Sequence, residues 1–212
     1  MIEKLLILGA IVANYGEKGP VNPYTNVATL EIHAYTSALN PTQSHAYIVV
    51  KNLTSSGLLV GYKTVPAHGT VTLGKWSSGL SSFSSSVTLE YSGVYYNLEK
   101  YAFCHGGTHS NDIYLSATLI DDVMPTLNYV IQSENNGYSL LDDNCVTFAL
   151  DVWNSVATPS LAAAYNTPAS LRNVISMYAN DYIHYQNGYD FGYNSYFYRY
   201  NTSTNSWITY GD

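Results

Sequence analysis

The sequence predicts an α+β fold in which an antiparallel sheet packs against helices. Segments that alternate apolar with polar residues, rich in β-branched and aromatic types, dominate the first half of the 212-residue chain. Segments with the helical spacing of apolar residues follow in the second half. Nothing in the composition demands two domains. We therefore expect one domain over residues 27–212, preceded by an irregular lead-in over residues 1–26.

The strands are predicted from residue type and from the turns between them. The first three cover Ala28–Tyr35, Ser44–Lys51 and Leu58–Val65, and they are expected to form a meander. A turn at Asn40 and Pro41 and a polar loop at residues 52–57 separate them. Further strands are expected at residues 87–91, 94–100 and 113–117.

Three helices and a hairpin are predicted after these strands. Residues 118–133 have helical spacing, although Pro125 should delay the regular helix. A second helix begins near Cys145, and Thr167 caps a third over Pro168–Tyr178. The tyrosine-rich C-terminus ends in a predicted hairpin of residues 196–200 and 207–210.

Cys145 is the first candidate for chemistry. It opens an amphipathic helix whose apolar positions are Cys145, Phe148, Ala149, Val152, Trp153 and Val156. Asn144 and Asp143 are preferred N-cap types, so Cys145 falls in the first turn, where the helix dipole favours an anion. Such a position lowers a thiol pKa and favours a nucleophile. The alternative is a small buried residue at a helix start.

The composition excludes one class of partner and favours one location. Lysine and arginine number 8 against 15 acidic residues, a net charge of −7, which is a poor match to nucleic acid. Charged residues are only 11% of the chain, while tyrosine occurs 22 times. This polar, weakly charged composition favours a secreted or cell-surface protein. The apolar run Leu5–Ala13 fits either a leader or a packed first element, and no integral membrane segment is expected.

The two cysteines allow two other interpretations. A bridge between Cys104 and Cys145 would make both structural. Cys104, His105 and His109 also have a spacing compatible with zinc, but a structural site needs a fourth ligand. An exposed loop is the better interpretation of this segment, so neither a metal nor another cofactor is predicted.

A cysteine nucleophile needs a base, and six histidines are available. His45 is the preferred candidate because it begins a strongly patterned strand, which is a rigid support. The order of Ser44–Ile48 and the later Tyr138–Asn154 segment, with its Asn-Cys-x-x-Phe motif, resembles the circularly permuted NlpC/P60 (papain-like) group, notably its small secreted bacterial members. The resemblance covers roughly residues 28–178.

The resemblance implies a papain-like fold and a cysteine peptidase or amidase. Cys145 would be the nucleophile and His45 the base, and the Cys145 backbone N–H would help to bind the oxyanion. Tyr138 either supplies a hydroxyl near the reaction centre or packs structurally, and Asn144 is a supporting residue. The implied substrate is a peptide, a protein or the peptide of peptidoglycan.

The group that orients His45 is less evident. If the strands beside the 52–57 loop pair about its middle, His45 lies opposite Thr64, with Tyr62 on the same face. Neither residue is a carboxylate or an amide, so Asn97 or His33 could take the role. The lack of an evident third group also favours the alternative of a noncatalytic surface module that binds through its tyrosine-rich face.

Overall fold

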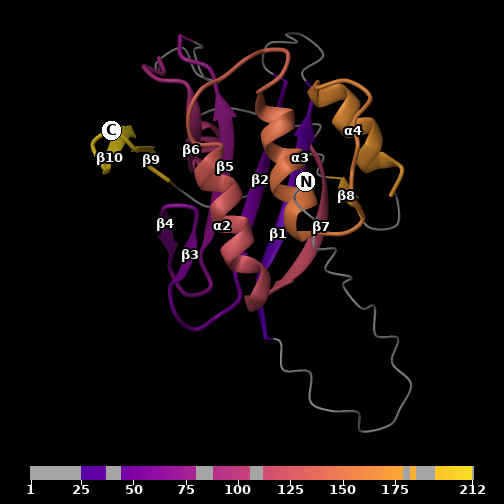
Figure 1. Cartoon of the computed structure of the whole chain (residues 1–212), viewed down its shortest axis with the longest axis horizontal. Helices are drawn as coiled ribbons and strands as arrows, with labels where there is room; N and C mark the ends of the chain where they lie inside the picture. The colour runs from indigo at the N-terminus through magenta and orange to yellow at the C-terminus, as the bar shows by residue number, and fades with distance from the viewer. Residues whose placement is uncertain are drawn as a thin grey trace, which may run out of the picture.

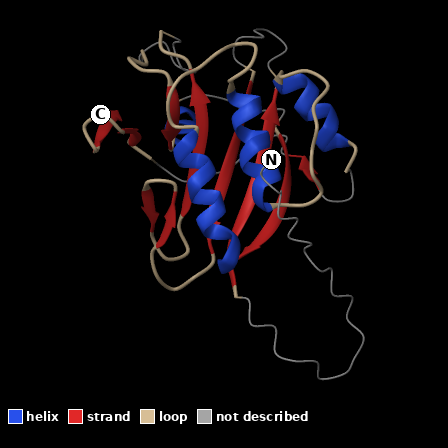
Figure 2. Ribbon diagram, viewed as in Figure 1, coloured by secondary structure: helices blue, strands red, loops and turns tan. Residues whose placement is uncertain are grey.

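A computed structural model of the chain describes residues 25–36, 44–79, 88–105, 112–178, 182–184 and 194–211. An antiparallel sheet of eight strands forms its centre, in the order β10-β9-β6-β5-β2-β1-β7-β8 (Figure 1). Helices α2, α3 and α4 lie side by side along one face of this sheet (Figure 2). The predicted α+β class, with an antiparallel sheet packed against helices, is confirmed.

The elements have the following bounds. The strands of the large sheet are β1 (Asn26–Tyr35), β2 (His45–Asn52), β5 (Thr70–Trp76), β6 (Gly93–Tyr96), β7 (Ile113–Ile120), β8 (Tyr182–His184), β9 (Tyr196–Asn201) and β10 (Ser206–Gly211). Strands β3 (Leu58–Val60) and β4 (Lys63–Val65) form a separate hairpin. The helices are α1 (Leu98–Cys104), α2 (Met124–Ser133) after a 3₁₀ turn at Asp121–Val123, α3 (Cys145–Val156) and α4 (Pro168–Ser176).

The central strands β1 and β2 are buried on both faces. Their alternate residues, such as Leu30, Ile32 and Ile48, join the core beneath α2, α3 and α4. The other alternate residues of each strand point to the opposite face of the sheet. There, further along the sheet, Leu98 and Tyr101 of α1 pack with Trp76, Tyr95 and Phe197. Helix α1 therefore covers the face opposite the other three helices.

The predicted meander is wrong at its third strand. Residues 58–65 form two short strands that turn at Gly61, whose φ is 59°, and Tyr62. Strand β2 instead pairs with β5, with Ile48 opposite Leu73. The side chain of Asn52 closes the neck of this inserted hairpin, since its Nδ2 donates to the carbonyls of Ser56, Val65 and Pro66.

The predicted strand at 94–100 is also wrong in its second half. Strand β6 ends at Tyr96, and Asn97 adopts a left-handed conformation with φ of 64°. Its Oδ1 accepts the Thr72 N–H at 3.2 Å, which ends the strand, and α1 begins at once. Among the described residues 88–91, no regular strand forms, and Cys104 closes α1 instead of standing in a loop.

The remaining predicted elements agree with the structure except at residues 118–120, which were expected to be helical and instead continue β7. The helix at Cys145, the helix capped by Thr167 and the C-terminal hairpin form as expected, and Pro125 occupies the first turn of α2. The lead-in over residues 1–24, with the apolar run, lies outside the described residues, and β1 begins at Asn26. In the part of the chain that is described, no helix has both the length and the apolar character needed to cross a membrane.

A buried ionic network lies on the face of β1 that points away from α3. The Nδ1 atom of His33 is 2.9 Å from Asp112 and its Nε2 is 3.1 Å from Glu31, which also pairs with Lys51 at 2.7 Å. The hydroxyl of Tyr47 donates to the same Asp112 oxygen. Burial alone would lower the pKa of His33, but the two carboxylates outweigh it and raise that pKa.

We predict that His33→Gln destabilises the fold by about 3–5 kcal/mol, because it leaves the buried Asp112 carboxylate without its cation and leaves Glu31 paired with Lys51 alone. Since the folded pKa of His33 is raised, its contribution is complete below the unfolded value of about 6.5 and is lost as pH rises through the folded value. Urea unfolding between pH 5 and pH 9 should therefore show wild-type stability falling above about pH 6.5. The variant should lose most of that slope, and equal slopes in both proteins would contradict the assignment.

Candidate active site

Helix α3 presents Cys145 at its first position because Asn144 caps it. The Asn144 Oδ1 accepts the N–H groups of Val146 at 2.8 Å and Thr147 at 3.3 Å, and the Thr147 hydroxyl accepts the Asn144 N–H at 2.8 Å. The Asn144 Nδ2 donates to the carbonyls of Leu140 and Asn166. Both ends of this amide are occupied, so Asn144 supports the site and is not available as an oxyanion donor.

The loop before Cys145 is anchored to the sheet. Ser139 and Asp143 exchange two backbone hydrogen bonds, of 2.7 and 3.1 Å, which close a tight turn. The buried Lys75 ammonium of β5 pairs with the Asp143 carboxylate and, at 2.8 Å, with Glu134 at the end of α2. These contacts fix the start of α3 against β5.

His45 is the first residue of β2 and lies between Cys145 and Glu99 of α1. Its Nε2 is 3.2 Å from the Glu99 Oε1, which also accepts the Trp76 indole N–H at 3.2 Å. The Trp76 ring lies 3.8 Å from the imidazole, centre to centre. The imidazole and Cys145 also lie close enough for each to shift the pKa of the other, and because Nε2 faces Glu99, Nδ1 is the nitrogen left for the thiol.

Cys145 and His45 shift each other's protonation in the sense of an ion pair. Burial opposes a thiolate, but the charge and hydrogen bond of His45, with the Ala46 backbone N–H, outweigh it and lower the pKa of Cys145. Burial likewise opposes an imidazolium, but Cys145 and then Glu99 raise the pKa of His45 to about 9. Both shifts favour a thiolate next to an imidazolium, which is a nucleophile next to a proton donor.

Glu99 is the functional residue that sequence reasoning missed. It is fully buried, and the hydrogen bond and charge of His45 outweigh its burial and lower the pKa of its carboxyl group. The expected strand over 94–100 concealed it. The signal was present, because Asn97 is a common cap residue and Leu98, Tyr101 and Ala102 have helical spacing.

The other candidates for the third group lie elsewhere. Tyr62 stacks on Tyr200 with centres 4.0 Å apart, and Thr64 pairs with Leu59 across the small hairpin. They do not face His45 because β5, and not residues 58–65, is the next strand. Asn97 binds the Thr72 N–H, and His33 binds Asp112 and Glu31.

Tyr138 is brought to the sulfur. Burial raises the pKa of Tyr138 and the charge of the nearby Cys145 raises it further, so the phenol stays protonated and can donate. Both interpretations of this residue, a hydroxyl near the reaction centre and structural packing, stay predictions.

The disulfide interpretation of the cysteines is not supported by the structure. Cys104 and Cys145 are not joined by a disulfide, and the Asn194 N–H donates to the Cys104 sulfur at 3.2 Å. In the described ranges, no cluster of three or more His, Cys, Asp or Glu side chains is placed to hold a metal ion, and His109 lies outside them.

Comparison with protein-family models, with curated proteins and with solved structures returns no match for this chain. The function is therefore inferred from the geometry of this site.

Gly74 of β5 forms the floor beneath His45 and Glu99. A Cβ atom at this position would lie within 3.0 Å of Glu99 Oε1, His45 Nε2 and the Trp76 indole nitrogen. Real Cβ atoms do not approach other atoms so closely, so only glycine lets the imidazole and the carboxylate meet here.

We predict that Gly74→Ala separates His45 from Glu99 and lowers the alkylation rate of Cys145 at neutral pH roughly tenfold, about 1.4 kcal/mol. The matched control is Gly79→Ala. Gly79 has a φ of 77° and open space around its Cβ position, so alanine strains the backbone there without touching the site. Equal alkylation rates in the two variants, with both folded, would contradict the role of Gly74.

Proposed function

We propose that this protein is a cysteine hydrolase, a peptidase or amidase that acts through a thioester, with a permuted papain-like arrangement of its site. One observation carries the proposal: the buried His45 imidazole lies between the Cys145 thiol and the Glu99 carboxylate, and it lowers the thiol pKa. The resemblance of the His45 and Cys145 segments to the NlpC/P60 group supports the same reaction class.

The proposed reaction has two halves. The Cys145 thiolate attacks the carbonyl carbon of the scissile amide, and the carbonyl oxygen becomes an oxyanion. As the C–N bond breaks, His45 gives its proton to the leaving amine and a thioester forms. A water molecule then attacks the thioester while His45 accepts its proton, and the carboxylic acid and thiolate are released. Glu99 acts as a positioning residue that holds the imidazole and stabilises its charged form.

Two donors are placed to stabilise the oxyanion. The Asn144 Oδ1 occupies the N–H groups of Val146 and Thr147, which leaves the Cys145 backbone N–H beside its own sulfur. The hydroxyl of Tyr138 also reaches the sulfur. When the substrate's carbonyl carbon is bonded to the Cys145 sulfur, its oxyanion would lie near both donors.

The proposed substrate is a peptide or the peptide portion of a cell wall, and the proposed location is secreted or at the cell surface. The family resemblance supports the substrate. The weakly charged, tyrosine-rich composition and the net charge of −7 support the location and argue against nucleic acid as a partner.

The test is the alkylation rate of Cys145 against that of Cys104 in the native protein between pH 5 and pH 10, read by mass spectrometry. Cys145 should react as a thiolate well below the ordinary thiol pKa of about 8.5. In His45→Ala, burial of the thiol is no longer offset, so its pKa should rise and its reaction at pH 7 should slow at least about tenfold.

Glu99→Gln keeps the shape of the site and removes one charge from His45. This change should lower the pKa of His45, which is about 9 in the wild-type protein. As pH rises, the variant should therefore lose the thiolate–imidazolium pair at a lower pH than the wild type does. Cys104 serves as the internal control in each sample. If Cys145 reacts no faster than Cys104 at pH 6, or if His45→Ala leaves its profile unchanged, the hydrolase proposal fails and the noncatalytic binding module takes its place.

Tyr138→Phe separates oxyanion binding from thiol activation. Loss of one oxyanion donor should lower the rate of acylation by a peptide ester or amide by about 10²–10³-fold. The alkylation rate of Cys145 should change far less, because His45 and Ala46 still stabilise the thiolate. Tyr129→Phe is the matched control, since Tyr129 is 72% exposed on α2. Unchanged acylation in Tyr138→Phe would assign its hydroxyl to structure alone.

A further inference from the structure

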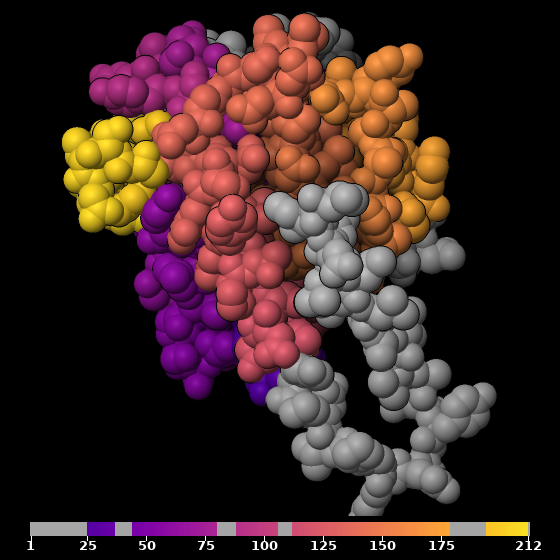
Figure 3. Space-filling model, in the orientation of Figure 1, coloured from indigo at the N-terminus to yellow at the C-terminus, as the bar shows by residue number. Residues whose placement is uncertain are grey.

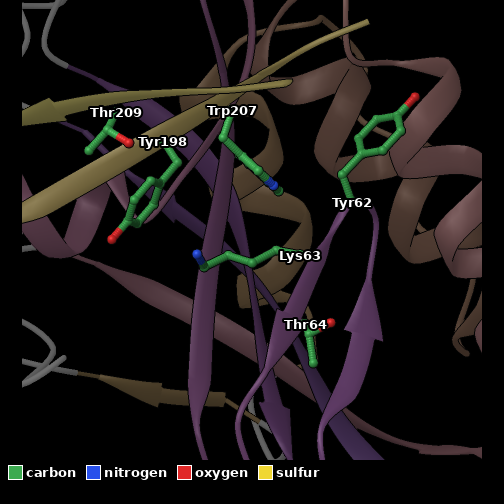
Figure 4. Close-up of a pocket in the computed structure, with 6 residues that line it drawn as sticks. All are labelled: Tyr62, Lys63, Thr64, Tyr198, Trp207 and Thr209. Carbon is green, nitrogen blue, oxygen red and sulfur yellow. The ribbon is translucent and has the colours of Figure 1, made fainter. Parts of the chain in front are cut away.

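A second site lies where the β3–β4 hairpin meets the C-terminal hairpin. The two segments lie next to each other at one side of the molecule, the first indigo to purple and the second yellow (Figure 3). A pocket of about 370 Å³ opens between them (Figure 4), and it is lined by Tyr62, Lys63, Thr64, Tyr198, Trp207 and Thr209. The Cys145 site uses other elements, namely β2, α1 and the start of α3.

The Lys63 ammonium reaches into this pocket with no anion beside it. Its Nζ lies 3.9 Å from the centre of the Tyr198 ring and 5.4 Å from that of Trp207. Within the described ranges, no carboxylate pairs with it and no acceptor binds it, whereas Lys51 and Lys75 each pair with acids. A half-buried cation in the wall of a pocket is suited to an anionic ligand.

A second ammonium adds to the positive charge near Lys63. Burial lowers the pKa of Lys100 to about 8, against the charge of Cys104 and together with that of Lys63, so the two lysines are within electrostatic reach. The Lys100 Nζ donates to the carbonyl of Thr70. Two cations therefore lie near each other in a chain with a net charge of −7.

The aromatic wall of the pocket is held in place by its neighbours. Trp207 packs edge-on against Tyr96 and Tyr200, with centres 5.1 Å apart in each pair. It is nevertheless 37% exposed, while the other two tryptophans, Trp76 and Trp153, are 7% and 0% exposed. A fixed, accessible indole provides a flat apolar surface at little cost in side-chain entropy.

We propose that this pocket binds an acidic sugar, a pyranose that carries a carboxylate, as found in uronic acid oligosaccharides. The apolar C–H face of the ring would stack on Trp207. The sugar hydroxyls would bind Thr64, Thr209 and the tyrosine hydroxyls, and the carboxylate would pair with Lys63. The lining consists of rings, hydroxyls and one cation, which favours a sugar over an extended peptide, whose recognition needs backbone groups. This binding goes beyond the proposed hydrolase activity and does not depend on it.

The experiment is a titration of the tryptophan fluorescence of the full chain with galacturonic acid oligosaccharides and with the same oligosaccharides as methyl esters. Because Trp207 is the exposed tryptophan, a saturable change should appear with the acids and disappear in Trp207→Phe. Calorimetry gives the affinity of the variants that lack the signal. Rising salt should weaken binding, because an ion pair contributes to it.

Lys63→Gln should weaken binding roughly tenfold or more, and Lys63→Arg should retain most of it, because a charge-assisted hydrogen bond is lost only in the first. Tyr129→Phe on α2 should bind as the wild type does. Equal binding of acids and esters, or no effect of Lys63→Gln, would overturn the proposal. Binding of a peptide through its C-terminal carboxylate, with none of the acidic sugar, would overturn it as well. Since no arm measures hydrolysis, the proposed function can fail while this site stands.

Discussion

The candidate site depends on one buried arrangement, the His45 imidazole held between the Cys145 thiol and the Glu99 carboxyl group. Burial disfavours the charged form of each of the three groups. Their pKa values are nevertheless shifted toward the charged forms, because His45 favours the anions on both sides and the anions favour the imidazolium. A structure that separated them by even one strand would leave neutral groups and an ordinary cysteine.

Such a set can form only where three layers of the fold end together. Cys145 belongs to the helices on one face, His45 to the sheet, and Glu99 to the single helix on the other face. The Asn144 cap and the Lys75 ion pairs fix the helix end against the sheet. Glycine at position 74 leaves room for the imidazole and the carboxylate on the far side. The site therefore depends on the relative position of three elements, since no single element contains all three groups.

Because the three groups come from different elements, only part of the site could be predicted from the sequence. The start of α3, its Asn144 cap and the strand that begins at His45 follow from local patterns, and they agree with the structure. The partner of His45 is set by long-range pairing, which a local pattern does not record. If the strands on either side of the 52–57 loop paired with each other, Thr64 would lie opposite His45. Residues 58–65 instead form their own hairpin, and β2 pairs with β5. Glu99 was missed because one residue, Asn97, converts an apparent strand into a helix.

The inserted hairpin also has a positive consequence. By closing the hairpin neck, Asn52 directs Tyr62, Lys63 and Thr64 away from the β2–β5 interface and toward the C-terminal hairpin. There Tyr62 stacks on Tyr200, and Lys63 lies over Tyr198. The same displacement that removes Thr64 and Tyr62 from the cysteine therefore builds the aromatic pocket. A segment first interpreted as part of the catalytic site is therefore one wall of the pocket proposed to bind a sugar, while His45 lies on β2 in the interior of the large sheet.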